Sequence, residues 1–138
     1  EGVIVACGGM TGGYTMFIKN NRLYYDYNFL DGVHYILKSP DLPKGKTDLK
    51  FSFIRTKEFG GKGELYVNDE KVDEVEMPQM HISTYSLAET FDVGRDTGTQ
   101  VSDLYIGVFK FTGNLDRVIF MISDDNTVPP RKLPAVYY

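Results

Sequence analysis

The chain has one cysteine, no tryptophan and no excess of positive charge. The single cysteine, Cys7, cannot form a disulfide within the chain, and its apolar surroundings favour a small buried thiol over a reactive one. A net charge of −4 gives no basic field for phosphate groups, so nucleic acid is not expected as a partner. No apolar run approaches the roughly 18 residues of a membrane-spanning helix, so no membrane partner is expected either.

What the chain does contain is enough apolar surface for one folded domain. Its 138 residues are 42% hydrophobic and include ten tyrosines and nine phenylalanines. We expect one domain over residues 1–122 and a Pro-rich C-terminal tail over 123–138, which holds three of the six prolines. No signal peptide is visible and the chain begins at Glu1, as expected of a piece excised or processed from a longer protein.

The apolar residues alternate with polar ones along most of the chain, which is the pattern of half-buried strands. The clearest case is the segment 22–29, whose apolar face is formed by Leu23, Tyr25, Tyr27 and Phe29. The segments 33–38 and 49–54 repeat the alternation. No stretch has the period of an amphipathic helix, so the sequence predicts an all-β protein.

Short turns separate these segments. The pairs Asn20-Asn21, Asp31-Gly32 and Asn68-Asp69 consist of residues that tolerate the positive φ of tight hairpin turns, and they predict antiparallel hairpins. With no helices to cover it, a sheet with one apolar face must pack against a second sheet. We therefore predict a two-sheet antiparallel β-sandwich of about 10 to 13 strands.

Two runs are apolar on both faces, as expected of strands covered on both sides. They are 2–7 and 117–122, and their positions at opposite ends of the domain suggest that they pair at its centre. Val5, Phe53 and Phe120 are accordingly predicted to face the core.

A set of motifs carries a resemblance to a known family. It includes Gly2-Val-Ile-Val-Ala-Cys-Gly-Gly9, Tyr27-Asn-Phe29, Phe91-Asp-Val-Gly-Arg-Asp-Thr-Gly-Thr-Gln-Val-Ser-Asp-Leu-Tyr105 and Phe111-Thr-Gly113. In order and spacing they resemble the C-terminal domain of bacterial arylsulfatases, over residues 1 to 122. The hairpin 63–72 resembles one of concanavalin A-like (laminin G-type) jelly rolls. Gln100 departs from the pattern, because the family commonly has proline there.

The resemblance implies a jelly-roll accessory domain. Such a domain would pack on or orient a sulfatase catalytic domain, in the same polypeptide or in a partner chain, and a periplasmic or extracellular location would follow. The family's catalytic domain makes its formylglycine from the cysteine of a Cys-x-Pro-x-Arg motif. Around Cys7 the sequence is Cys-Gly-Gly-Met-Thr, without the proline or the arginine. The chain alone is therefore expected not to be an enzyme, although it resembles part of a sulfuric ester hydrolase.

Other candidate sites have two interpretations each. Asp92, Asp96 and Asp103 lie in a glycine-containing loop. They could offer oxygens to Ca²⁺ as a cofactor, or could accept hydrogen bonds that close turns, which we favour. Glu74 and Glu76 could be the paired carboxylates of a glycosidase, but their charged neighbours favour a solvated edge strand. The two histidines have no companions at the spacing of zinc ligands.

Four tyrosines, Tyr14, Tyr24, Tyr66 and Tyr105, fall at solvent-facing or loop positions of the predicted strands. Tyrosine presents a flat apolar face with a polar tip, which suits a sugar ring or a neighbouring domain. Packing within the core or between domains is the favoured interpretation. Glycan contact leaves open an alternative function, that of a carbohydrate-binding, lectin-like module.

Overall fold

The computed structural model describes residues 1–81 and 89–122. Within these ranges the chain forms strands and loops, with no helix of the length and hydrophobicity needed to cross a membrane. The strands are β1 (Gly2–Gly9), β2 (Gly12–Lys19), β3 (Arg22–Leu30), β4 (Val33–Asp41), β5 (Leu49–Lys57), β6 (Gly60–Val67), β7 (Glu70–Met77) and β8 (Phe91–Val93).

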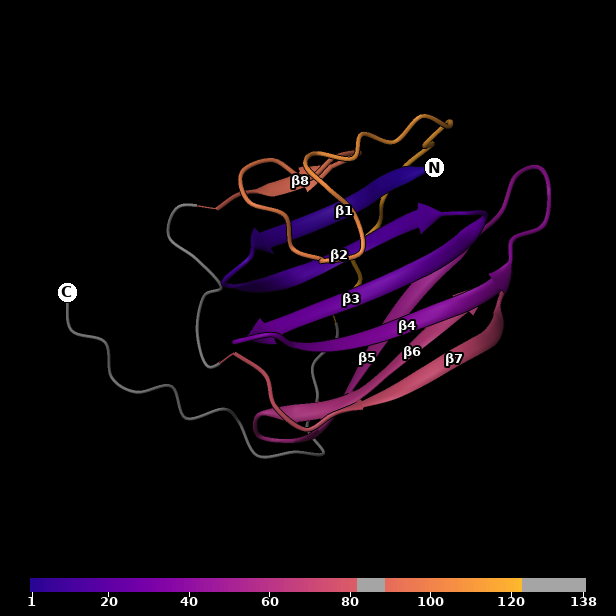
Figure 1. The fold of residues 1–138 in the computed structure, drawn as a ribbon. Coiled ribbons are helices and arrows are strands. Elements are labelled where there is room, and N and C mark those ends of the chain that lie inside the picture. The colour runs from indigo at the N-terminus through magenta and orange to yellow at the C-terminus, as the bar shows by residue number, and fades with distance from the viewer. Residues whose placement is uncertain (82–88, 123–138) are drawn as a thin grey trace.

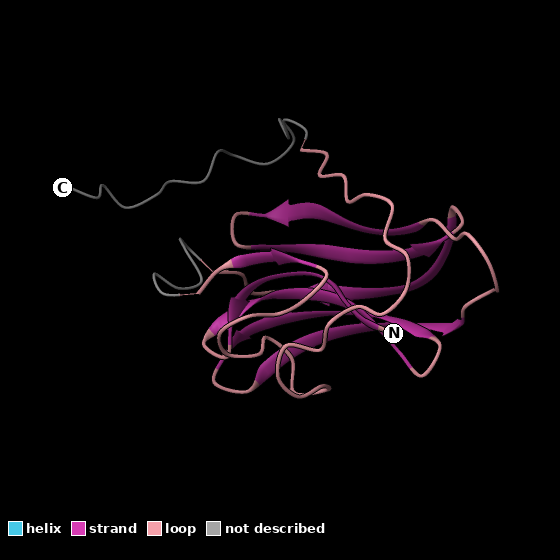
Figure 2. Ribbon diagram, turned by 90° about the horizontal axis from the view of Figure 1, so that it is seen from above, coloured by secondary structure: helices cyan, strands magenta, loops and turns pink. Residues whose placement is uncertain are grey.

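These strands form two antiparallel sheets that pack face to face (Figures 1 and 2). One sheet has five strands in the order β4-β3-β2-β1-β8, and the other has three in the order β5-β6-β7. The predicted all-β, two-sheet antiparallel sandwich is confirmed. The described residues contain eight strands where about 10 to 13 were expected, because residues 94–122 form loops and turns with one isolated bridge at Lys110. The finer jelly-roll topology stays a prediction.

The predicted hairpin turns are confirmed by the backbone angles. Between β2 and β3, Asn20 and Asn21 have φ of 51° and 59°. Between β6 and β7, Asn68 and Asp69 have φ of 49° and 65°, and the turn 31–32 between β3 and β4 has φ of 52° and 77°. Paired positive φ values match the right-handed twist of the strands on either side, so these short polar turns fix the register of three hairpins.

The main core lies between the two sheets. It contains the apolar face predicted for the segment 22–29: Leu23 is fully buried, Tyr27 is 1% exposed, and Tyr25 stacks on Phe51 of the opposite sheet with ring centroids 3.4 Å apart. Leu65 of β6 is buried in the same cluster. The alternation in the sequence therefore places these side chains correctly.

A second core lies on the outer face of the five-stranded sheet. The loop that follows β8 crosses this face (Figure 1), and its Val101 and Tyr105 pack on Val3 and Phe17 of the sheet. Strands β1 and β2 are consequently covered on both sides. This confirms the prediction that the apolar run 2–7 is buried on both faces.

The expectation for the run 117–122 was wrong. It is not a strand, and β1 pairs with β2 on one edge and with β8 on the other, so no place beside β1 is left for it. Val5 faces the core and Phe53 is partly buried against it, but Phe120 is 54% exposed. The tail 123–138 lies outside the described residues.

Candidate functional site

The motif 91–105, on which the family resemblance rests, begins in β8 and continues into the loop that follows. Asp92 of β8 accepts hydrogen bonds from residues in and next to this segment. Its Oδ2 accepts from the Thr97 hydroxyl at 2.6 Å, from the Thr97 N–H at 3.1 Å and from the Thr90 hydroxyl at 2.8 Å. Partial burial raises the pKa of Asp92, but these hydrogen bonds outweigh it and hold the pKa below its usual range. Asp92 thus fixes the first turn of the loop as a carboxylate.

Asp96 is the buried member of the acidic set, with 1% exposure. Its Oδ2 accepts hydrogen bonds from the Val101 N–H at 2.9 Å and from the Tyr105 hydroxyl. Burial raises the pKa of Asp96 and that of Tyr105. The Tyr105 hydroxyl also lies 3.2 Å from Thr15 Oγ1 on β2, so this network joins the loop to the sheet.

Asp103 lies elsewhere, beside His34 of β4. The Asp103 side chain is 85% exposed, and its Oδ2 is 3.4 Å from His34 Nε2. The other ring nitrogen, Nδ1, is 2.8 Å and 3.0 Å from the two carboxylate oxygens of Asp26, which is fully buried on β3. Burial raises the pKa of Asp26, opposed by hydrogen bonds from Ser102 and His34. No pattern in the sequence signals this contact, because its members are far apart along the chain.

The three aspartates therefore have separate partners. In the described ranges, no three His, Cys, Asp or Glu side chains gather into a group that could hold a metal ion. Asp92 and Asp96 accept backbone N–H groups, as the turn-closing interpretation predicts. The Ca²⁺ prediction for Asp92, Asp96 and Asp103 has no convergent oxygens to support it.

Three of the four candidate tyrosines pack within the protein. Tyr105 lies in the loop that follows β8 and is 3% exposed, because this loop folds back over the sheet and buries the ring. Tyr24 stacks on Phe17, with ring centroids 5.0 Å apart. Tyr14 is half-buried beside Cys7, and burial raises the pKa of Tyr14 to about 12. The favoured interpretation, packing within the core, describes these rings.

Tyr66 lies on the outer face of the three-stranded sheet. The Lys50 ammonium lies over its ring, 4.2 Å from the centroid, and its hydroxyl donates a hydrogen bond to Glu64. Glu64 pairs in register with Glu74 of β7, and Lys62 Nζ lies 2.7 Å from Glu74 and 3.6 Å from Glu64. This set is a network of charges on one sheet face, in which Glu64 is nearly buried and Lys62 and Glu74 are partly exposed.

The same network bears on the paired-carboxylate hypothesis. Hydrogen bonds from Lys62 and Lys71 lower the pKa of Glu74 to about 2, and the hydrogen bond from Tyr66 lowers the pKa of Glu64. A glycosidase needs one carboxylic acid with a raised pKa as its proton donor. Of the proposed pair, Glu74 is held ionised, with no raised pKa to make it a proton donor, and Glu76 lies opposite Lys62 in register.

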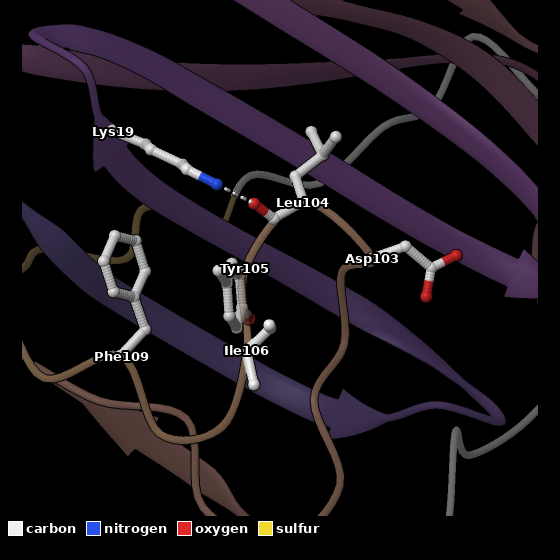
Figure 3. Close-up of a pocket in the computed structure, with 6 residues that line it drawn as sticks. All are labelled: Lys19, Asp103, Leu104, Tyr105, Ile106 and Phe109. Carbon is white, nitrogen blue, oxygen red and sulfur yellow. Dashed lines mark hydrogen bonds between the residues drawn. The ribbon is translucent and has the colours of Figure 1, made fainter.

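A shallow hollow of about 300 Å³ lies where the loop meets the end of β2 (Figure 3). Lys19 Nζ donates a hydrogen bond to the Leu104 carbonyl at 2.6 Å and so holds the loop at its edge. Phe109 and Ile106 line the hollow, and Ile106 is 91% exposed. Its lining is mostly apolar, with one cation, Lys19, and one carboxylate, Asp103.

In comparisons with known proteins, no family model, curated protein or solved structure matches this chain. The resemblance to the arylsulfatase C-terminal domain therefore stays a prediction based on the motifs.

Proposed function

We propose that the chain is a non-catalytic accessory domain of an arylsulfatase-type hydrolase, which packs on a sulfatase catalytic domain of the same polypeptide or of a partner chain. The motif behind the family resemblance supports this role, because its residues build structure. Phe91 to Val93 form β8, while Asp96 and Tyr105 attach the loop to the sheet. A periplasmic or extracellular location belongs to the same proposal and rests on the resemblance.

The observation that carries the proposal is an exposed apolar patch beside β8. Phe91 and Val93 are 50% and 49% exposed, and the Phe91 ring contacts that of Phe120 at a centroid distance of 5.5 Å. The patch continues along the chain to Met121 and Ile122, which are 84% and 95% exposed. Contiguous exposed apolar residues are costly in water and mark surfaces that another protein or domain covers.

The carbohydrate-binding alternative finds less support. Of the four tyrosines, Tyr105 is buried, and Tyr14 and Tyr24 pack against their own sheet. Tyr66 has one ring face under Lys50. What remains for a glycan is the small hollow beside Lys19, so we place the accessory role first.

The proposal can be tested by mixing the purified chain with a purified sulfatase catalytic domain, carrying Cys-x-Pro-x-Arg, from the same genome. We expect a 1:1 complex by size-exclusion chromatography with light scattering, and no aryl sulfate hydrolysis by the chain alone. Phe120→Asp should prevent the complex, because a charge would be buried unpaired in the interface.

Ile54→Asp is the matched control. Ile54 is also exposed, at 46%, but lies on β5 of the three-stranded sheet and not in or beside β8. Its variant should bind as the unmodified chain does. Equal binding by Phe120→Asp, or hydrolysis by the rigorously purified chain, would contradict the proposal.

A further inference from the structure

A buried carboxylate holds the middle of the loop 94–109 on the five-stranded sheet. Backbone hydrogen bonds to β1 fix both ends of this loop. Between the ends, Asp96 Oδ2 accepts from the Val101 N–H at 2.9 Å and from the Tyr105 hydroxyl, and both donors belong to the second core. The protonation state of Asp96 therefore bears on how firmly the loop is attached.

The negative charge of an ionised Asp96 has little to compensate it. The side chain is 1% exposed, and the charged groups that act on it, Asp92 and Glu89, are both acidic. The Tyr105 hydroxyl and its neighbour on β2, Thr15, are neutral. Burial raises the pKa of Tyr105, so that hydroxyl keeps its proton. Loss of water and the two like charges both disfavour the carboxylate form.

The geometry also leaves a place for a proton. Asp96 Oδ1 is buried and has no hydrogen-bond partner among the described residues, whereas Oδ2 accepts both hydrogen bonds. A proton on Oδ1 would remove the charge and displace neither of these hydrogen bonds. The neutral acid would thus keep the contacts that hold the loop and avoid the cost of burying a charge.

We propose that Asp96 is a pH-sensitive switch: the loop 94–109 lies more firmly on the sheet when Asp96 is protonated, and it opens more often as the pH rises and the carboxylate ionises. Opening lets water reach the charged group. The parts affected are the second core and the hollow of Figure 3, most of whose lining belongs to the same loop. This inference is independent of the accessory role.

The sign of the effect follows from burial. Burial raises the pKa of Asp96 above its usual value of 3.8. A group whose pKa is higher in the closed state contributes stability that is complete below pH 3.8 and is lost as the pH rises through the higher pKa. Acidification from neutral pH should therefore strengthen the attachment of the loop.

The test compares the unmodified chain with Asp96→Asn by hydrogen exchange of the Val101 N–H and by urea unfolding. Asparagine keeps an oxygen acceptor but cannot ionise. We expect the ratio of the two protection factors, unmodified chain over variant at the same pH, to increase about twofold or more from about pH 7 to about pH 4. The urea midpoint of the unmodified chain should rise relative to that of the variant over the same range.

Asp92→Asn is the matched control in the same segment. Hydrogen bonds lower the pKa of Asp92, so the same ratio for this variant should stay level or fall on acidification. If Asp96→Asn does not fold, the carbon-13 signal of the Asp96 carboxyl in the unmodified chain should titrate with a midpoint above 3.8. A ratio for Asp96→Asn that stays constant or falls, or a carboxyl midpoint at or below 3.8, would overturn the proposal.

Discussion

Asp96 shows, as a single residue, how an acidic side chain can serve the fold. Its carboxylate is 1% exposed and accepts from the Val101 N–H and the Tyr105 hydroxyl. Burial raises its pKa, which means that desolvation of the charge opposes the hydrogen bonds. Without this carboxylate the buried Val101 N–H would lose its acceptor, and the Tyr105 hydroxyl would keep only Thr15 Oγ1 at 3.2 Å.

We therefore expect Asp96→Ala to lower the free energy of unfolding by about 1 to 3 kcal/mol, the cost of buried donors left without partners. Urea unfolding at neutral pH measures it. Asp103→Ala, at an exposed position of the same loop, should change stability by less than about 0.5 kcal/mol. If the two variants are equally stable, the loop does not depend on the buried carboxylate.

Strand β7 shows how charge keeps one face of a whole element in water. Glu74 lies 2.7 Å from both Lys62 Nζ and Lys71 Nζ, and the hydrogen bonds from these lysines lower the pKa of Glu74 to about 2 from a usual value of 4.5. Charged residues on such a face also oppose pairing with other chains. The side chains of Glu74 and Lys71 are 47% and 44% exposed, so salt should weaken this ion pair.

The sign of the pH dependence follows from that lowered pKa. Glu74 contributes stability above pH 4.5, where it is ionised in both states, and loses it as the pH falls toward 2. The stability difference between the unmodified chain and Glu74→Gln should therefore shrink between these pH values. Urea midpoints across this range test it, and a difference that stays constant with pH would show that the ion pairs contribute nothing.

In the molecule as a whole, two cores share one sheet. The five-stranded sheet packs on the three-stranded sheet through one face and on the loop through the other, with Leu65 and Val101 in the respective clusters. Strands β1 and β2 contribute residues to both hydrophobic clusters. Unfolding of one cluster should therefore destabilise the other. The described residues should therefore unfold as one cooperative unit.

Leu65→Ala tests this coupling. Removal of a fully buried leucine should cost about 2 to 5 kcal/mol. Far-ultraviolet circular dichroism and tyrosine fluorescence should report one urea transition before and after the change, shifted equally for both signals. Two separate transitions would show that the loop and the sandwich are independent units.

The hairpins and their faces could be predicted from the amino-acid sequence. Alternation placed Leu23, Tyr25 and Tyr27 in the core, and the polar pairs at 20–21 and 68–69 placed the turns, because side-chain period and positive φ are local properties of the chain. The burial of the run 2–7 on both faces could also be predicted, since residues at both its odd and its even positions are apolar.

The contacts between segments that are distant in sequence could not be predicted, because they are decided by tertiary packing. The run 117–122 has the same apolar pattern as 2–7, yet β8 occupies the edge of β1, and strand order is not encoded in local pattern. The burial of Tyr105 depends on a loop that folds back by way of Asp96. The approach of His34 to Asp103 joins a strand to a loop far along the chain, and such a contact is set by tertiary packing because no local spacing rule connects residues so distant in sequence.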